Sequence, residues 1–124
     1  MPTLADYGLL IIRIGIGAVF IAHGWPKIRT PKGMASEMGW PTSAVIMLGL
    51  AEFLGGLGSL LGIFTQSASL LIMVTMIGAL YYHIFKWKSL FISSEKTGWD
   101  FAVSMLLSAL ALYLLGPGSI VVGW

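Results

Sequence analysis

The sequence predicts an all-α protein, a single bundle of four membrane-spanning helices with a short interfacial helix in its first long loop. Hydrophobic residues make up 57% of the 124 residues and charged residues only 10%, and the mean hydropathy is +0.91. A soluble domain of this size could not bury so much apolar surface, so we expect the remaining apolar contact to be with lipid. Four apolar runs, at residues 7–25, 43–64, 68–87 and 97–115, supply the spans.

The first span is expected over residues 7–25, after a polar lead that lacks the features of a cleaved signal peptide. It is expected to end before Pro26, because proline has no backbone N–H and disfavours helix in the residue before it. At 100° per residue, one stripe of this helix faces inward. That stripe holds Arg13, Gly17, Phe20, Gly24 and Lys27, with His23 at its margin.

The first long loop, residues 26–42, is expected to contain the interfacial helix. Thr30 and Pro31 form a helix start, and Gly39 is placed to end the helix. Trp25 and Trp40 bracket the segment, as aromatic anchors do at the headgroup level of a membrane.

The second span, residues 43–64, carries Glu52 near the middle of the membrane. An ionised carboxylate in hydrocarbon costs several kcal/mol unless a neighbour supplies a proton, a cation or hydrogen-bond donors. Small residues, Gly49, Gly55, Gly56 and Ser59, share its helical stripe and allow another backbone to approach closely. Glu52 is therefore expected to face a tightly packed helix.

A turn at residues 65–67 joins the second span to the third, residues 68–87, as an antiparallel hairpin. The fourth span, residues 97–115, begins with a capping-box pattern formed by Thr97 and Asp100. The sequence GPG at 116–118 ends this span, and an apolar tail follows on the membrane surface.

Charge asymmetry predicts the topology of the four spans. All cations other than Arg13 fall in the first and third loops, at Lys27, Arg29, Lys32, Lys86, Lys88 and Lys96. The positive-inside rule then places both long basic loops in the cytoplasm and both termini outside. These few loop cations are too sparse for a nucleic-acid surface. Without cysteine, the chain itself can form no disulfide and offers no thiolate for a metal or a thiol relay.

The polar residues of the spans fall into two layers. In the central layer, Arg13 lies roughly a third of the way in from the outer side and Glu52 about half-way, and the long arginine side chain is expected to reach the carboxylate. This pair is either a device that fixes helix register or part of a ligand site. A second layer collects near the cytoplasmic ends of the helices, at His23, Lys27, His83, Trp99 and Asp100.

Plainer roles compete for the second layer. His83 is either an interfacial side chain or a ligand contact, Asp100 serves first as a capping acid, and Lys27 as a topological charge. The chain has no dense motif of His and acidic residues such as HExxH, so no metal site is predicted. Haem held by His23 and His83 is a less favoured alternative.

Several motifs together resemble the DoxX family. They are RIGIGAVFIAHGWPK at 13–27, GWP at 39–41, AEFLGGLG at 51–58, GIFT at 62–65, WDFA at 99–102 and LGPGS at 115–119. The resemblance implies a small four-helix protein of a prokaryotic inner (plasma) membrane, with relatives among quinone-linked oxidoreductase subunits and thiol-stress complexes. It implies importance for Arg13, Gly24, Lys27, Glu52, Gly55 and Gly56.

The leading hypothesis is a redox-associated membrane subunit that binds a quinone-like or other small amphipathic molecule inside the bundle. Glu52 and His23 are the candidate catalytic residues, and the candidate ligand contacts are Arg13, Lys27, His83, Trp99 and Asp100. Electrons would pass through the bound molecule or through a partner oxidoreductase subunit. The alternatives are a non-catalytic scaffold or assembly factor that self-associates as a homo-oligomer and, less favoured, a small-molecule transporter.

Overall fold

The computed structural model describes residues 1–86 and 99–121, and every regular element in these ranges is helical. The predicted all-α class is therefore confirmed. The elements are α1 (Leu4–Arg29), α2 (Lys32–Met38), α3 (Thr42–Leu61), α4 (Thr65–Tyr81), a π-helical turn η1 (Tyr82–Lys86) and α5 (Trp99–Leu115).

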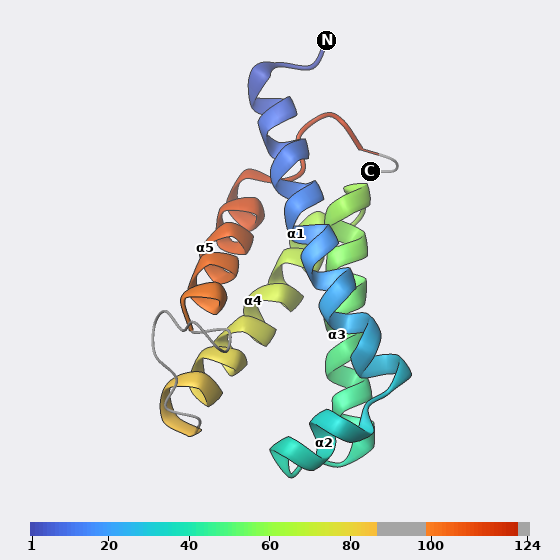
Figure 1. Ribbon diagram of the computed structural model, residues 1–124. Helices are drawn as coiled ribbons and strands as arrows, with labels where there is room; N and C mark the ends of the chain where they lie inside the picture. The colour runs from blue at the N-terminus through green and yellow to red at the C-terminus, as the bar shows by residue number, and fades with distance from the viewer. Residues whose placement is uncertain (87–98, 122–124) are drawn as a thin grey trace.

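The long helices form two packed pairs that meet through α3 and α4 (Figure 1). In the first pair, α1 runs along most of α3, and in the second, α4 packs against α5. The end of α3 next to α2 and the far end of α4 point away from each other (Figure 1). α2 and η1 lie at the same end of the molecule, where Trp40, just after α2, contacts Tyr82 of η1.

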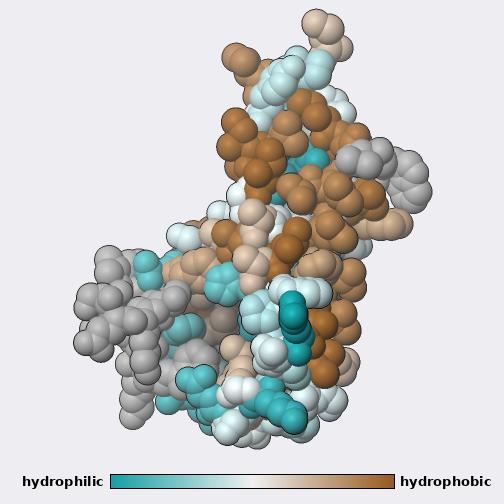
Figure 2. All heavy atoms as spheres, turned by 45° about the vertical axis from the view of Figure 1, so that its right-hand side comes forward, coloured by the Kyte–Doolittle hydropathy of each residue, from teal (hydrophilic) through white to brown (hydrophobic). Residues whose placement is uncertain are grey.

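Three helical stretches are long and apolar enough to cross a membrane: Leu4–Arg29, Thr42–Leu61 and Thr65–Lys86. Trp99–Leu115 is a shorter apolar helix. Large apolar side chains are exposed along all of them, for example at Ile11, Met47, Leu54, Val74 and Leu114. Figure 2 shows this apolar surface over most of the upper body, with hydrophilic side chains gathered at the lower end. Such a surface fits contact with lipid rather than water.

Both ends of α1 extend beyond the predicted span of 7–25. The helix begins at Leu4 because Thr3 and Asp6 form a capping box, in which each side chain accepts a backbone N–H bond from the other residue. It also continues through Pro26 to Arg29. The backbone N–H and the hydroxyl of Thr30 both donate to the carbonyl oxygen of Pro26, at 2.7 and 3.2 Å, and so close the last turn.

The hairpin between α3 and α4 has the predicted antiparallel form, but its turn lies earlier than expected. Gly62 adopts a left-handed conformation with φ of 76° and ends α3 at Leu61, so residues 62–64 form the turn and α4 begins at Thr65. The predicted interfacial helix is present as α2, and Gly39 ends it with φ of 69°. Thr30 does not cap α2, since its hydroxyl is bound to α1. The predicted cap residue Thr97 lies outside the described residues.

Glycine pairs set the close approach of α1 to α3. A Cβ atom built at Gly17 would lie 2.8 Å from the carbonyl oxygen of Gly56, and one at Gly24 would lie 2.6 Å from that of Gly49. Real Cβ contacts are almost never this short, so these positions require glycine for the observed packing. The predicted inward face of the first helix is confirmed, because Arg13, Gly17, Phe20 and Gly24 are all buried.

Candidate functional site

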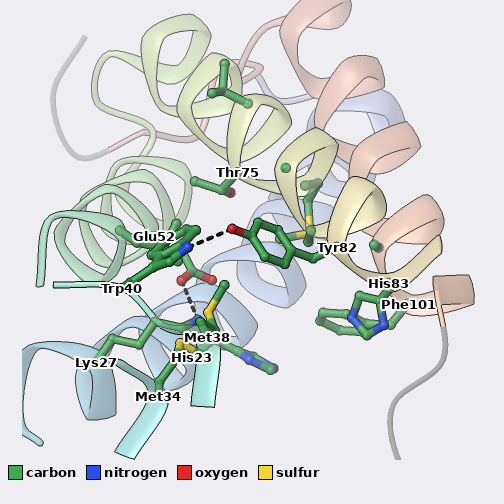
Figure 3. Close-up of a pocket in the computed structure, with 16 residues that line it drawn as sticks. His23, Lys27, Met34, Met38, Trp40, Glu52, Thr75, Tyr82, His83 and Phe101 are labelled. Carbon is green, nitrogen blue, oxygen red and sulfur yellow. Dashed lines mark hydrogen bonds and ion pairs between the residues drawn. The ribbon is translucent and has the colours of Figure 1, made fainter. Parts of the chain in front are cut away.

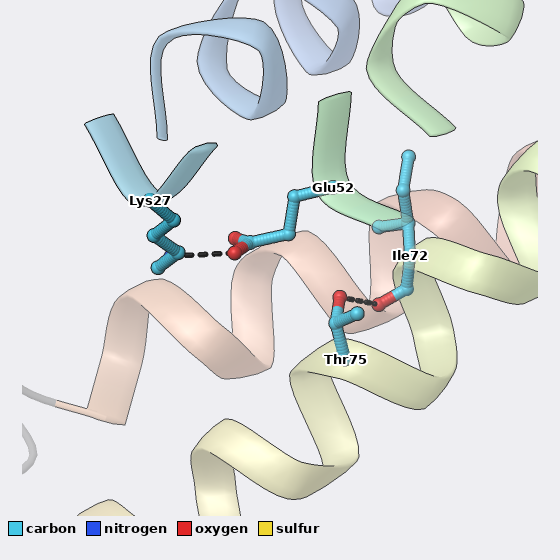
Figure 4. A network of polar contacts seen from close by, with 4 residues as sticks. All are labelled: Lys27, Glu52, Ile72 and Thr75. Carbon is cyan, nitrogen blue, oxygen red and sulfur yellow. Dashed lines mark hydrogen bonds and ion pairs between the residues drawn. The ribbon is translucent and has the colours of Figure 1, made fainter. Parts of the chain in front are cut away.

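The close packing of α1 on α3 brings Lys27 and Glu52 together. Lys27 Nζ lies 2.5 Å from Glu52 Oε1, and the two side chains are 13% and 4% exposed. Figure 4 shows Glu52 extending from α3 toward Lys27. A buried charge pair of this kind is costly to break, because removing one partner leaves the other charge without compensation in a low dielectric. The position of Glu52 in an apolar span predicts a compensating group beside it, and Lys27 supplies the cation.

The predicted pair between Arg13 and Glu52 is wrong. Arg13 Nε donates to the carbonyl oxygen of Ser59 at 2.9 Å and Nη2 to that of Leu60 at 3.1 Å. These carbonyls belong to the last turn of α3, where helical donors are lacking. The prediction considered only how deep the two residues lie in the membrane and how long an arginine side chain is. A side chain on a helix also leans toward the N-terminus of its own helix. Arg13 therefore leans away from Glu52.

Arg13 also holds the segment that follows α5. Its Nη1 donates to the carbonyl oxygens of Pro117 and Ile120, at 3.0 and 2.6 Å. Nearby, the carboxylate of Asp6 accepts the backbone N–H of Ser119 at 3.0 Å. Through these four hydrogen bonds the guanidinium ties the end of α3 and the C-terminal segment to α1, a structural task at the end of the molecule away from α2.

A pocket of about 340 Å³ lies between the two helix pairs, and the Lys27–Glu52 pair forms part of its wall (Figure 3). Apolar and aromatic side chains dominate the lining, with a few polar groups among them. This composition is typical of small-molecule sites. The lining residues are His23, Lys27, Met34, Met38, Trp40, Leu48, Glu52, Val74, Thr75, Met76, Gly78, Ala79, Tyr82, His83, Phe101 and Ala102.

Two aromatic pairs stand in the wall of this pocket. Trp40 Nε1 donates to the hydroxyl of Tyr82 at 2.6 Å, with the two rings edge to face at 5.5 Å, which joins the loop before α3 to η1. The ring of His23 stacks on Phe101 at 5.2 Å, which joins α1 to α5. Rings held in this way give the pocket fixed walls, because each is restrained from two elements.

The structure brings together four of the seven predicted site residues, His23, Lys27, Glu52 and His83, around one pocket. Trp99 and Asp100 are not among the lining residues, although Phe101 and Ala102 directly after them are. Arg13 lies apart, as described above. Within residues 1–86 and 99–121, no three His, Asp or Glu side chains converge as a bound metal would require.

Sequence reasoning missed much of the lining. Trp40 was expected only as a membrane anchor, and Tyr82, Phe101, Met34 and Met38 were assigned no role in a site. A signal was present for Met34 and Met38, since they lie four residues apart and so share one face of the short helix α2. Apolar side chains at this spacing are equally typical of helix packing, so the sequence does not distinguish a packing role from a role in lining a pocket.

Comparison with known proteins identifies the family. The DoxX family model matches residues 8–87 of this chain. The chain belongs to the DoxX family. It is 34% identical over 87 residues to "Inner membrane protein YqjF" of Escherichia coli (strain K12), which covers 67% of either chain. It is 26% identical over 114 residues to "Putative oxidoreductase CatD" of Bacillus subtilis (strain 168), covering 90% of this chain and 81% of that protein. No solved structure matches.

The region that matches the DoxX family contains the Lys27–Glu52 pair and both residues of the Trp40–Tyr82 contact. Phe101, which stacks on His23, lies in α5 beyond the matched region. The charged centre of the site therefore belongs to the part of the chain that defines its DoxX membership, and α5 adds one wall.

Proposed function

We propose that this DoxX-family membrane protein is a redox-associated subunit that binds a quinone-like or other small amphipathic molecule in the pocket between its helix pairs. The observation that carries the proposal is the Lys27–Glu52 pair, which lies buried in the wall of a largely apolar pocket between membrane-length helices. Such a pocket offers a ring an apolar enclosure and offers polar substituents a small number of fixed partners.

The chemistry of the pocket suits a neutral ring with carbonyl or hydroxyl groups. Lys27 and Glu52 neutralise each other, so a ligand with a net charge would lack a counter-charge in a low-dielectric site. A carbonyl oxygen could instead accept a hydrogen bond from the ammonium group of Lys27. The volume of about 340 Å³ is at the lower end of the range of about 300–1,000 Å³ for small-molecule sites. It suits a head group, and a long tail would extend among the helices or lipid.

Proton handling is the role proposed for Glu52 and His23. Glu52 would hold or release a proton beside the ligand, and His23, which titrates near neutral pH when unperturbed, would serve as a second proton-carrying group. His83 contributes a further polar contact in the pocket wall. Because the chain has no cysteine, electrons would move through the bound molecule or a partner oxidoreductase subunit.

In the membrane, we assign α5 as the fourth span and place the bundle in the inner membrane of a prokaryote. The 17 residues of α5 reach about 25 Å at 1.5 Å per residue, close to the thickness of the hydrocarbon core. The name of the Escherichia coli relative supports the compartment. The long basic loops are assigned to the cytoplasm and both termini to the outside. The name of the Bacillus subtilis relative supports the link to redox chemistry.

Titration of the purified protein with a ubiquinone analogue, followed by quenching of tryptophan fluorescence, tests the proposal. Trp40 lies in the pocket wall, so saturable quenching is expected in the wild type. Glu52→Gln should weaken the affinity at least about tenfold, since one hydrogen bond to a charged group contributes about 1.5–3 kcal/mol. Glu37→Gln is the matched control, because Glu37 is an exposed carboxylate on α2 that does not line the pocket.

Absence of saturable binding in the wild type, or equal affinity of Glu52→Gln and wild type, would refute the quinone proposal. The scaffold alternative gives a different result. In that case Glu52→Gln lowers the melting temperature of the ligand-free protein while no analogue binds. Melting temperatures of both variants without ligand therefore accompany the titration.

A further inference from the structure

A second cavity lies next to the ligand pocket and adjoins Lys27 of the Lys27–Glu52 pair. It has a volume of about 390 Å³ and lies between the last two turns of α1 and the start of α2. The lining residues are Ala22, His23, Pro26, Lys27, Thr30 and Met34. His23, Lys27 and Met34 also line the ligand pocket, so these three side chains form the partition between the two cavities.

The second cavity has the polarity and access that water requires. Pro26 has no N–H to donate to the carbonyl group of Ala22, so the helix leaves an acceptor without its usual donor beside this cavity. Ala22, Pro26 and Thr30 are exposed. A cavity of this size with several polar groups in its wall holds water readily. The ligand pocket likewise has mostly apolar walls with a few polar groups among them.

Lys27 connects the second cavity to the buried carboxylate. Its side chain lines the second cavity and is 13% exposed, whereas Glu52, to which its Nζ is bonded at 2.5 Å, is 4% exposed and lines the ligand pocket alone. His23 and Glu52 are the titratable groups that line these cavities beside Lys27 near the partition. A ligand in the first pocket would displace water from the carboxylate on that side, and the second cavity would remain as the route to solvent.

We infer that the second cavity is a water-filled proton route, through which Glu52 exchanges protons with solvent by way of Lys27. The ammonium group passes one proton along the existing hydrogen bond to the carboxylate of Glu52 and becomes a neutral amine. The amine then takes a proton from a hydronium ion in the second cavity, which is left as water. The net result is transfer of one proton from solvent to Glu52, with Lys27 restored to its charged form.

This inference rests on the proposed function only in treating Glu52 as a proton-carrying group, and its test needs no ligand. Because the chain lacks cysteine, Ala22→Cys introduces a single thiol into the wall of the second cavity. The variant is folded in nanodiscs and then treated with a charged, water-soluble methanethiosulfonate. Hydrogen exchange of the Lys27 ammonium with water is measured by NMR on 15N-lysine-labelled protein before and after modification. The Lys27 signal is assigned by its loss in Lys27→Arg.

Modification of Ala22→Cys is expected, with slowing of Lys27 exchange by about twofold or more, because water must then reach Lys27 from the ligand pocket, which Lys27 also lines, or through rarer openings of the structure. Gly33→Cys is the control, since Gly33 is exposed on α2 and lines neither cavity, and its modification should leave the exchange rate unchanged. Failure of the charged reagent to reach Ala22→Cys, or unchanged Lys27 exchange after modification, would overturn the inference. Loss of quinone binding alone would leave it standing.

Discussion

Replacement of Gly24 by alanine tests whether glycine contacts determine the stability of the α1–α3 pair. The added Cβ atom would lie 2.6 Å from the carbonyl oxygen of Gly49 and 2.7 Å from the backbone nitrogen of Phe53. Both atoms are backbone atoms of α3, so no side chain can rotate to relieve the overlap. To restore an ordinary contact of 3.4 Å, α1 and α3 must separate locally by about 0.8 Å.

The magnitude follows from two opposing terms. Overpacking in a close-packed contact costs about 1–3 kcal/mol, whereas alanine gains up to about 1 kcal/mol over glycine in helix propensity. Gly15 lies on the same helix, and a Cβ atom there would meet nothing within 4 Å. Gly15→Ala therefore gains the same helix propensity as Gly24→Ala but introduces no steric overlap. The difference between the two variants should be about 2 kcal/mol, roughly a thirtyfold change in the unfolding equilibrium.

Equilibrium unfolding in mixed micelles of mild detergent and dodecyl sulfate, followed by circular dichroism, provides the measurement. The wild type, Gly24→Ala and Gly15→Ala are compared at the same micelle composition. Gly24→Ala should unfold at a lower fraction of dodecyl sulfate than either of the others. If its free energy of unfolding lies within about 0.5 kcal/mol of that of Gly15→Ala, the glycine contacts do not control the packing of α1 on α3.

Three further outcomes are expected from the contacts in and around the site. Lys27→Met or Glu52→Leu alone should lower the free energy of unfolding by about 3–5 kcal/mol, and the double variant by less than the sum, in a double-mutant cycle. Arg13→Lys should cost about 2 kcal/mol or more and speed protease cleavage near residue 117, because a lysine has too few donors for the four carbonyl oxygens. Tyr82→Phe should cost about 1 kcal/mol and shift the fluorescence emission of Trp40, whose indole N–H loses its acceptor.

Local pattern was sufficient to predict which faces of the helices are buried. The stripe of Arg13, Gly17, Phe20 and Gly24 is buried as the 3.6-residue period indicates. Glu52 is buried with small residues around it, for the same reason. These predictions held because they depend on the geometry of one helix at a time.

The ends of helices were harder to predict, although the sequence contained the relevant signals. Thr3 and Asp6 have the same spacing as the capping box expected at Thr97 and Asp100, yet they were assigned to a polar lead. Pro26 suggested a helix end, but one lost hydrogen bond near a terminus is tolerated when a residue such as Thr30 closes the last turn. The position of each helix end depends on a few hydrogen bonds, and neighbouring end positions differ in free energy by only about 1 kcal/mol. A sequence pattern alone therefore does not predict which position is adopted.

To predict which cation pairs with Glu52, one must know the register of α1 against α3 and the direction in which each side chain leans. Gly17 meets Gly56 and Gly24 meets Gly49, so equal numbers of residues separate the contacts on α1 and on α3. In this register, Glu52 lies about 9 Å along the axis from Lys27 and about 12 Å from Arg13, a difference too small to decide between two long side chains. Side chains lean toward the N-terminus of their own helix, so in an antiparallel pair Lys27 and Glu52 converge while Arg13 points away. The charge pair at the centre of the site is thus a consequence of two glycine contacts that fix the helices in one register.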